Sequence, residues 1–341
     1  MKRPLTIIGG GLSGLALANG LRLADVPVKV MEAGHYPRHR VCGEFMAGLA
    51  EETVNALGLE SCFRDALYHH STQWFRSGKP VRNYELPSPA PGISRHTLDA
   101  RMAGQLRQRG GKLIEGARHD LGPAEGVIFT CGRVPSKRGL YGLKGHWSGI
   151  PEAGTCADLE LHLGQGAYVG ISGVEEGYTN VCGLFHEIAR GEFAKPVDRF
   201  LATLENAGLA YLAQRLKKAE FREGSFCSVS GLSYRRLSGQ RTGSIGDSYQ
   251  LMPPFTGNGM TIALESARQV LPLAIAYAEG AIDWTTFQQK TPYLLRKSFH
   301  RRYWVAGLLH PFVLKPALQP LLCTLARTNL LPFNSVYALT H

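Results

Sequence analysis

The stretch LTIIGGGLSGLALANGLRLADVPVKVME, residues 5–32, decides the fold. A short apolar run ends at the pattern Gly9-x-Gly11-x-x-Gly14. A helical run and a second apolar run follow, and the second one closes on Glu32. In a strand–helix–strand unit the first glycine permits the tight turn, the second lets a pyrophosphate approach the backbone, and the third lets the helix pack closely. The helix N-terminus attracts phosphate and the acid binds a ribose, so the stretch predicts a dinucleotide site.

Two simpler interpretations of this stretch are less favourable. An ordinary Gly-rich turn needs neither the flanking strands nor the acid at the end of the second one. A secretory leader would suit Lys2, Arg3 and the apolar run behind them. Leaders, however, do not carry three glycines inside the run and a strand after it. We therefore keep the nucleotide-binding interpretation.

The composition is that of a globular protein of 341 residues, long enough for two domains. Hydrophobic residues make up 44% and charged residues 19%, which is untypical of a disordered chain. The formal net charge is +11, but the basic residues are scattered except at residues 296–302. No nucleic-acid motif accompanies them, so we expect a solvated basic surface and no nucleic-acid partner.

Cysteines and apolar runs indicate where the protein resides. None of the seven cysteines forms a CxxC pair or a His/Cys cluster, which predicts reduced thiols, no metal site and a cytoplasmic protein. No uninterrupted apolar run has the length that a membrane span needs. The nearest candidate, residues 303–333, is interrupted by Pro311, Lys315, Pro316 and Pro320.

The rest of the chain alternates between two kinds of pattern. Antiparallel strands and helices next to them are predicted at residues 71–86, 157–185, 197–207, 209–219 and 225–232. Helices and buried strands typical of the N-terminal unit are predicted at residues 46–57, 97–109, 112–115 and 126–132. We expect an α/β fold in which a discontinuous nucleotide-binding domain is interleaved with a β-sheet substrate domain and followed by a helical C-terminal segment. The expected boundaries are residues 1–61, 93–138 and 236–291 for the first, 62–92 and 139–235 for the second, and 292–341 for the third.

A second nucleotide-binding signal is the pair Gly246-Asp247 at the end of a short predicted strand. A loop rich in Pro and Gly, residues 253–260, then leads to a predicted helix over residues 261–278. The carboxylate can hold sugar or polyol hydroxyls. The helix N-terminus can stabilise negative charge on a ring system, because glycines keep it free of bulky side chains.

Between the two signals, residues 38–45 form a basic loop. In a dinucleotide-binding fold a loop at this place runs along the cofactor, so Arg38 and Arg40 would face the pyrophosphate. A surface loop with a buried Cys42 is the alternative.

Together these motifs resemble FAD-dependent oxidoreductases, the class that includes p-hydroxybenzoate hydroxylase and the geranylgeranyl reductases. The resemblance rests on the first motif with Glu32, on Thr130-Cys131-Gly132 at a strand end and on the Gly246-Asp247 segment, in the same order over about residues 1–290. The sequence RVCGE at residues 40–44 resembles the Lys/Arg-x-Cys-Gly segment of the reductase branch. The resemblance implies a Rossmann-like FAD-binding domain and a β-sheet that covers the substrate.

The resemblance also implies FAD as the cofactor and NAD(P)H as a transient reductant. It assigns to FAD the residues Gly9, Gly11, Leu12, Ser13, Gly14, Glu32, Ala33, Arg40, Cys42, Gly43, Arg95, Cys131, Gly132, Asp247, Pro254, Gly257, Gly259 and Met260. Cys42 and Glu44 are the candidates closest to the flavin ring. His35, His39 and Tyr178 are weaker candidates for moving protons, and no single base is assigned.

Three motifs of particular subgroups are absent. Residues 130–138 lack the Asp-Gly pair of many hydroxylases, and the chain lacks both the WxWxIP motif of flavin-dependent halogenases and the YxWxFP pattern of archaeal-type lipid reductases. Halogenation is therefore disfavoured. We expect monooxygenation of an apolar aromatic, polyketide or quinone-like molecule, a reaction in which the flavin carries the chemistry and no protein nucleophile is needed.

Two alternatives remain open. Reduction of double bonds in an isoprenoid or lipid is favoured by the Cys42-Gly43 segment and by the apolar tail. A non-catalytic nucleotide-binding or membrane-docking protein would instead use residues 296–302 and the tail as its working surface. Helices that pack on the FAD-binding domain are the simpler interpretation of that tail.

Overall fold

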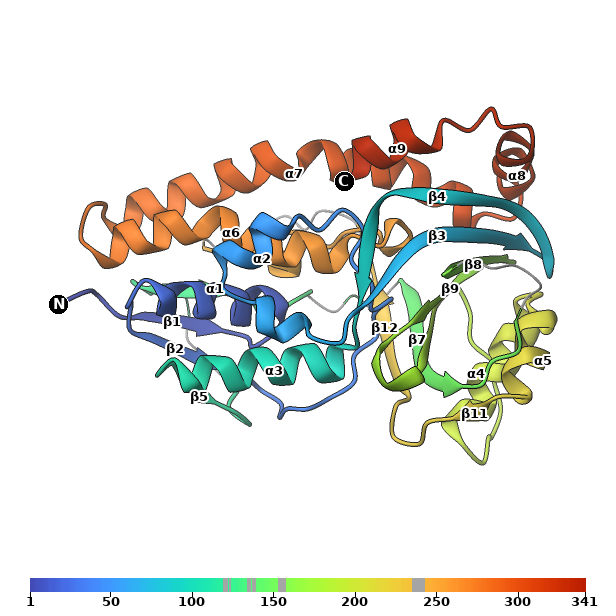
Figure 1. Cartoon of the computed structure of the whole chain (residues 1–341), viewed down its shortest axis with the longest axis horizontal. Helices are drawn as coiled ribbons and strands as arrows, with labels where there is room; N and C mark the ends of the chain where they lie inside the picture. The colour runs from blue at the N-terminus through green and yellow to red at the C-terminus, as the bar shows by residue number, and fades with distance from the viewer. Residues whose placement is uncertain (119–121, 123, 134–135, 137–138, 153–157, 235–242) are drawn as a thin grey trace.

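The computed structural model describes the chain except residues 119–121, 123, 134–135, 137–138, 153–157 and 235–242. Two sheets lie next to each other along the long axis of the molecule, and helices from the C-terminal part of the chain run along one side of both (Figure 1). The expected domain boundaries at 138/139 and 235/236 fall on residues outside this description. The division into domains therefore stays a prediction.

The first sheet is parallel and has the strand order β5-β2-β1-β6. Its strands are β1 (Leu5–Ile8), β2 (Val28–Met31), β5 (Lys112–Ile114) and β6 (Val127–Phe129). Parallel strands covered on both faces are apolar along their length, as the N-terminal stretch predicts. The Thr130 N–H donates to the Ile8 carbonyl at 2.7 Å, so the carboxyl ends of β1 and β6 meet at one edge.

Three long helices pack around this sheet: α1 (Leu12–Leu23), α3 (Arg95–Gln108) and α6 (Gly259–Ala278). The Asn19 amide of α1 donates to the Met102 carbonyl of α3 at 3.0 Å, and Leu271 of α6 packs against Gly20 of α1. Apolar side chains between the layers, such as Leu15 and Leu17, are fully buried. Burial of each such side chain stabilises the fold by about 1.5–3 kcal/mol. These layers form the main core of the protein.

The second sheet has eight strands, in the order β11-β7-β10-β9-β8-β3-β4 with β12 paired beside β7. Its strands are β3 (Leu67–Arg76), β4 (Lys79–Gly92), β7 (Leu140–Ser148), β8 (Leu159–Gly164), β9 (Ala167–Gly173), β10 (Thr179–Phe185), β11 (Glu220–Phe221) and β12 (Cys227–Leu232). All pairs are antiparallel except β3–β8. The helices α4 (Pro196–Asn206) and α5 (Ala210–Lys217) share an apolar core with one face.

Strand β7 has no counterpart among the predicted elements. Its sequence LYGLKGHWS does alternate, because Leu143 and Trp147 join the core under α4 and α5. Lys144 and His146 lie on the opposite face of the strand and are fully buried as well. A strand that is buried on both faces is usually predicted from a continuous apolar run. The polar residues on one face of β7 interrupt such a run, so the sequence pattern does not predict the strand.

The C-terminal part is helical, as expected, with α7 (Trp284–Leu314), α8 (Gln319–Arg327) and α9 (Phe333–Thr340). Pro311 lies inside α7 and does not end that helix. Packing of Val313 and Leu314 in the core at the second sheet stabilises the last turn despite the missing N–H. No single described helix meets the length and composition of a membrane span, whereas α7 and α8, bent by 101° at their break, do so together.

Two other predicted elements differ from the structure. The helix expected over residues 46–57 is shortened to α2 (Glu51–Ala56), because Phe45 pairs with Gly92 in an extended bridge and Gly48 has a left-handed φ of 69°. The strand expected before Gly246 is reduced to one bridge between Phe129 and Ser244. Short 3-10 helices complete the elements: η1 (Glu60–Phe63), η2 (Glu175–Gly177), η3 (Gly246–Ser248) and η4 (Pro254–Thr256).

Glu160 on β8 attaches α5 to the second sheet. Its two carboxylate oxygens accept hydrogen bonds from the Arg215 guanidinium at 2.6 and 2.9 Å, and His162 Nε2 lies 2.6 Å from one of them. Burial alone would raise the pKa of Glu160, but His162 and Arg215 lower it to about 2.

We predict that Glu160→Gln lowers the free energy of unfolding at pH 7 by about 3 kcal/mol, because it leaves Arg215 without its partner. A lowered pKa stabilises the fold above the ordinary value of 4.5, and this contribution is lost as the pH falls towards 2. The difference between variant and wild type in urea unfolding should therefore shrink over that range. Glu205→Gln, which breaks the exposed pair with Lys217 on α5, is the control and should change little. Equal losses in both variants would contradict the assignment.

Candidate cofactor and substrate site

A cavity of about 880 Å³ is lined by the carboxyl ends of β1 and β6, by the second sheet and by the C-terminal helices. Its volume lies near the upper end of the range for ligand pockets, about 300–1,000 Å³. In open α/β sheets, ligands bind outside the carboxyl ends of the parallel strands, which is the position of this cavity.

The start of α1 forms one wall of the cavity. Gly11 is the N-cap residue and has no side chain to cap the first N–H groups of the helix. A Cβ built on Gly11 would meet no atom within 4 Å, so the space in front of it is open. A Cβ on Gly14 would collide with the Gly9 carbonyl oxygen and with the Thr130 side chain. Gly11 therefore leaves room for a ligand, and Gly14 leaves room for the end of β1.

Glu32 is buried at the end of β2. Its carboxylate accepts hydrogen bonds from the N–H groups of Gly10 at 2.7 Å and Gly34 at 2.9 Å, and pairs with Arg38 at 2.6 Å. Burial would raise the pKa of Glu32, but Arg38 and Gly34 lower it overall. The Nε atoms of Arg38 and Arg40 are buried without a hydrogen bond, although Arg40 Nε lies 3.4 Å from the Asp99 carboxylate. Arg40 lines the cavity and would face an anionic ligand there, whereas Arg38 pairs with Glu32 and does not line the cavity.

Asp247 lies at the other side of the cavity and exposes its side chain to it. The surrounding protein raises the pKa of Asp247 to about 6 despite the charges of Arg95 and Arg133. A carboxylate in such a place is stabilised by hydroxyl groups that donate hydrogen bonds to it. The N-terminus of α6 lines the same cavity, and its N-cap residue Asn258 makes no side-chain cap.

The cavity extends into an apolar chamber between the second sheet and the C-terminal helices. Its apolar lining includes Trp74, Leu161, Phe255, Phe312, Val313 and Phe333. Tyr168 and Tyr234 also line the chamber, but their hydroxyl oxygens are buried in its wall. The surface of the chamber is thus mainly apolar.

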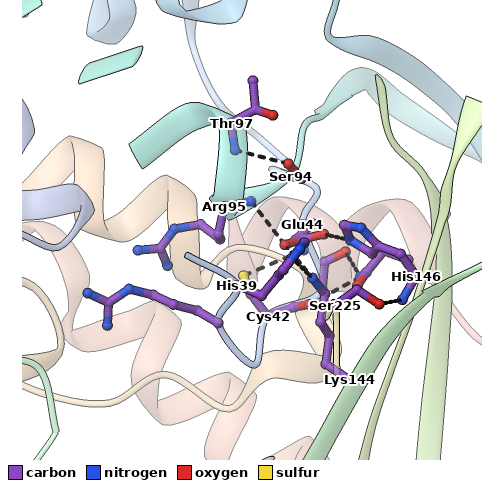
Figure 2. Close-up of polar contacts among 12 residues, drawn as sticks. His39, Cys42, Glu44, Ser94, Arg95, Thr97, Lys144, His146 and Ser225 are labelled. Carbon is purple, nitrogen blue, oxygen red and sulfur yellow. Dashed lines mark hydrogen bonds and ion pairs between the residues drawn. The ribbon is translucent and has the colours of Figure 1, made fainter. Parts of the chain in front are cut away.

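Glu44 is not among the residues that line the cavity and lies in a buried polar cluster (Figure 2). Its carboxylate contacts Lys144 Nζ at 3.1 Å and His146 Nε2 at 2.6 Å, and it accepts from the Arg95 N–H at 2.9 Å. Burial would raise the pKa of Glu44, but His146 and Lys144 hold it below its ordinary value. Lys144 Nζ also donates to His39 Nδ1 at 3.0 Å, and His39 itself lines the cavity.

Comparisons with known proteins find relatives by sequence and by fold. No protein-family model matches the chain. A curated relative, menaquinone reductase of Mycolicibacterium smegmatis, is 24% identical over an alignment that covers 89% of this chain and 83% of that protein.

Solved structures match over nearly the whole chain. A flavin-dependent brominase gives a TM-score of 0.75 at 15% identity and covers 98% of this chain and 92% of its own. p-Nitrophenol 4-monooxygenase of Pseudomonas putida gives 0.73 at 12% identity with 99% of both chains covered. A geranylgeranyl bacteriochlorophyll reductase-like protein of Thermoplasma acidophilum gives 0.68 at 16% identity, with 95% and 92% covered.

The chain has the fold of FAD-dependent oxidoreductases. The residues present fit the cofactor of that fold, since the open space at Gly11, the guanidinium of Arg40 and the Asp247 carboxyl group with its raised pKa all occur along one cavity. Every residue that the sequence assigns to FAD lines this cavity except Gly14, which packs behind it. Their contacts with FAD stay a prediction.

Other sequence-derived candidates lie elsewhere, and some lining residues escaped prediction. His35 and Tyr178 are not among the residues that line the cavity, whereas His39 and Cys42 are. The lining residues that the sequence did not single out include Tyr168, Tyr234, Cys182 and Cys227. They lie on strands or beside them, where only the direction of the strand face would have indicated the cavity.

Burial disfavours the thiolate form of three cysteines along the cavity. Of the seven cysteines, Cys156 lies outside the described residues. Cys42, Cys182 and Cys227 line the cavity. Burial raises the pKa of all three, that of Cys227 to about 12.

We predict that Gly11→Ala and Gly14→Ala separate binding from folding. Gly11→Ala should keep the thermal midpoint of the cofactor-free protein and weaken FAD binding at least about tenfold, or 1.4 kcal/mol, because its methyl group enters the open space. Gly14→Ala should lower the midpoint itself, because its methyl group collides with backbone. Differential scanning fluorimetry and a fluorescence titration with FAD measure the two effects. Unaltered FAD affinity in Gly11→Ala would refute the pyrophosphate assignment.

Proposed function

We propose that the protein is an FAD-dependent oxidoreductase that takes electrons from NAD(P)H and acts on an apolar, ring-containing small molecule. One observation carries this proposal. Segments from the beginning, middle and end of the chain, each with the chemistry of a different part of FAD, line a single cavity that continues into an apolar chamber. The sequence has no second GxGxxG motif for a nicotinamide cofactor, so NAD(P)H would bind only transiently.

In this proposal the chain binds and orients, and the cofactor supplies the redox step. The start of α1 holds the pyrophosphate, Glu32 the adenosine ribose, and Asp247 the ribityl hydroxyls. The α6 N-terminus stabilises negative charge at the pyrimidine edge of the ring. When bound and reduced, FAD supplies either a hydride or an activated form of O₂.

The chamber suggests the substrate class. Its apolar lining excludes water and favours an aromatic, polyketide or quinone-like molecule.

Monooxygenation is the first candidate reaction, and double-bond reduction is the second. The first is supported by solved structures that are named as monooxygenases and match at TM-scores of 0.69 and 0.73. The second is supported by the curated menaquinone reductase and by the RVCGE segment at residues 40–44.

The purified protein should show the absorption spectrum of an oxidised flavin and release FAD on denaturation. With NADPH or NADH and a panel of alkylated phenols and naphthoquinones, label from ¹⁸O₂ should enter the product. Product that forms without oxygen and carries no label would exclude monooxygenation and favour reduction. A colourless protein that takes up no FAD would overturn the whole proposal and favour the non-catalytic alternative.

We further propose that this cytoplasmic protein touches a membrane surface through its tail, where apolar substrates gather. Trp304, Leu308, Leu321, Leu330 and Leu339 are exposed there, close in sequence to the basic residues 296–302.

Co-sedimentation with vesicles rich in phosphatidylglycerol tests the membrane contact. The fraction of protein that sediments with the vesicles should be several-fold lower for the double variant Trp304→Ser, Leu308→Ser than for the wild type. Leu23→Ser removes an equally exposed leucine from α1 and is the control. Vesicle binding that is equal in all three proteins would contradict the role of the tail.

A further inference from the structure

Lys144 occupies an unusual place for a lysine. It lies in the middle of the second sheet, with Cys182 of β10 and Cys227 of β12 directly opposite it. Directly opposed residues of antiparallel strands share one face, and both cysteines line the cavity. Lys144 therefore belongs to the face that borders the cavity, yet its side chain is fully buried.

The end of the Lys144 side chain lies between an acid and a base (Figure 2). Its Nζ atom is 3.1 Å from Glu44 Oε1 and 3.0 Å from His39 Nδ1. Because Nδ1 accepts from the ammonium, the proton of a neutral His39 ring sits on Nε2. Nε2 has no hydrogen-bond partner among the described residues, and the ring lines the cavity.

Charges surround the pair. Glu44 is an anion that also accepts from His146 and the Arg95 N–H, so the Lys144 side chain has a buried counter-ion. Burial and the neighbouring Lys144 and His146 lower the pKa of His39 to about 3. His39 therefore does not store a second proton and can only pass one on.

His39, Glu44 and His146 also place their ligand atoms within 4.8 Å of one another, as in a metal site. The Lys144 ammonium contacts both His39 and Glu44, so the chain itself supplies the cation.

We propose that Lys144 and His39 form a proton relay that delivers a proton from the buried ammonium to the cavity. The inference rests on the proposed function, because that function determines what accepts the proton. In the step, the His39 Nε2–H bond breaks as the proton moves to an acceptor in the cavity, and an Nδ1–H bond forms with the proton of Lys144. The lysine is left as a neutral amine until Nε2 takes up a proton from water in the cavity and the Nδ1 proton returns to Nζ, which restores both groups. No electron moves along the relay.

Both candidate reactions take up such a proton. Reduction of a quinone or a double bond needs one hydride, which reduced flavin supplies, and one proton. Oxygenation places one atom of O₂ in the product and releases the other as water, which requires protons as well. His39 would be the catalytic residue, and Lys144 and Glu44 would position and charge it.

Rapid mixing of photoreduced, FAD-loaded protein with 2-methyl-1,4-naphthoquinone under anaerobic conditions tests the relay in its simplest form. The quinone gains a hydride from the flavin and a proton from the protein. His39→Gln should slow flavin oxidation by about 100-fold with unchanged FAD affinity, because the amide accepts from Lys144 but cannot transfer a proton. The solvent deuterium isotope effect of the wild type should disappear or change in the variant.

His96→Gln is the matched control. The His96 ring stacks on His39 with centroids 4.6 Å apart, but His96 is not among the lining residues. This control should keep both the rate and the isotope effect of the wild type. A His39→Gln variant that behaves like His96→Gln would overturn the relay while FAD binding and quinone reduction stayed intact.

A second measurement does not depend on turnover. In ¹⁵N-histidine-labelled protein, His39 should be the neutral Nε2–H tautomer from pH 8 down to about pH 5, with Nδ1 as a hydrogen-bond acceptor. The groups that face its ring are Lys144, His146, His96 and Glu44. Lys144→Met should raise the pKa of His39, because one of its neighbouring cations is removed.

The two measurements separate the proposals. A wild type that binds no FAD or does not reduce the quinone would refute the proposed function, and the NMR spectrum would still decide the relay. A charged His39 at pH 7, or a proton on Nδ1, would refute the relay whatever the kinetics show. Should Lys144→Met not fold, the His39→Gln comparison and the wild-type spectrum decide alone.

Discussion

The buried carboxylate of Glu44 joins the two halves of the molecule. The loop that carries it leaves the parallel sheet after β2 and inserts its carboxylate between Lys144 and His146 of β7. The Gly43 carbonyl beside it accepts from Ser172 at 2.7 Å and from Asn180 at 2.9 Å. A charge removed from water is tolerated only with such partners, so the loop and the second sheet cannot separate without a large loss of free energy. The cavity between the sheets owes its shape to this contact.

The nucleotide-binding part could be predicted because its signals are local in sequence. The turn at Gly9, the helix start at Gly11 and the acid at Glu32 lie within one strand–helix–strand unit, and the spacing fixes their geometry. The Gly246-Asp247 segment is equally local. Comparison of these segments with a known family was enough to gather residues that the structure brings to one cavity.

The remainder depends on contacts between residues far apart in the chain. Lys144 and His146 meet Glu44 across about a hundred residues, and neither side shows the interaction in its own sequence. Pro311 indicates a helix end by its chemistry, yet packing of the following turn outweighs it. The pairing of Arg38 with Glu32 likewise became visible only once the loop was placed. Contacts between buried polar groups that are far apart in the chain are thus the feature of this fold that local sequence patterns do not predict.

The thiols around the cavity bear on how long such a protein would last. Flavin sites that meet O₂ are exposed to peroxide, and peroxide attacks the thiolate form of cysteine to give sulfenic acid. Cys42, Cys182 and Cys227 are held as thiols by burial, so the reactive form is scarce at each of them. An acidic thiol at any of these positions would be consumed by the chemistry beside it. The apolar setting that shields a substrate from water therefore also protects the wall of the cavity from oxidation.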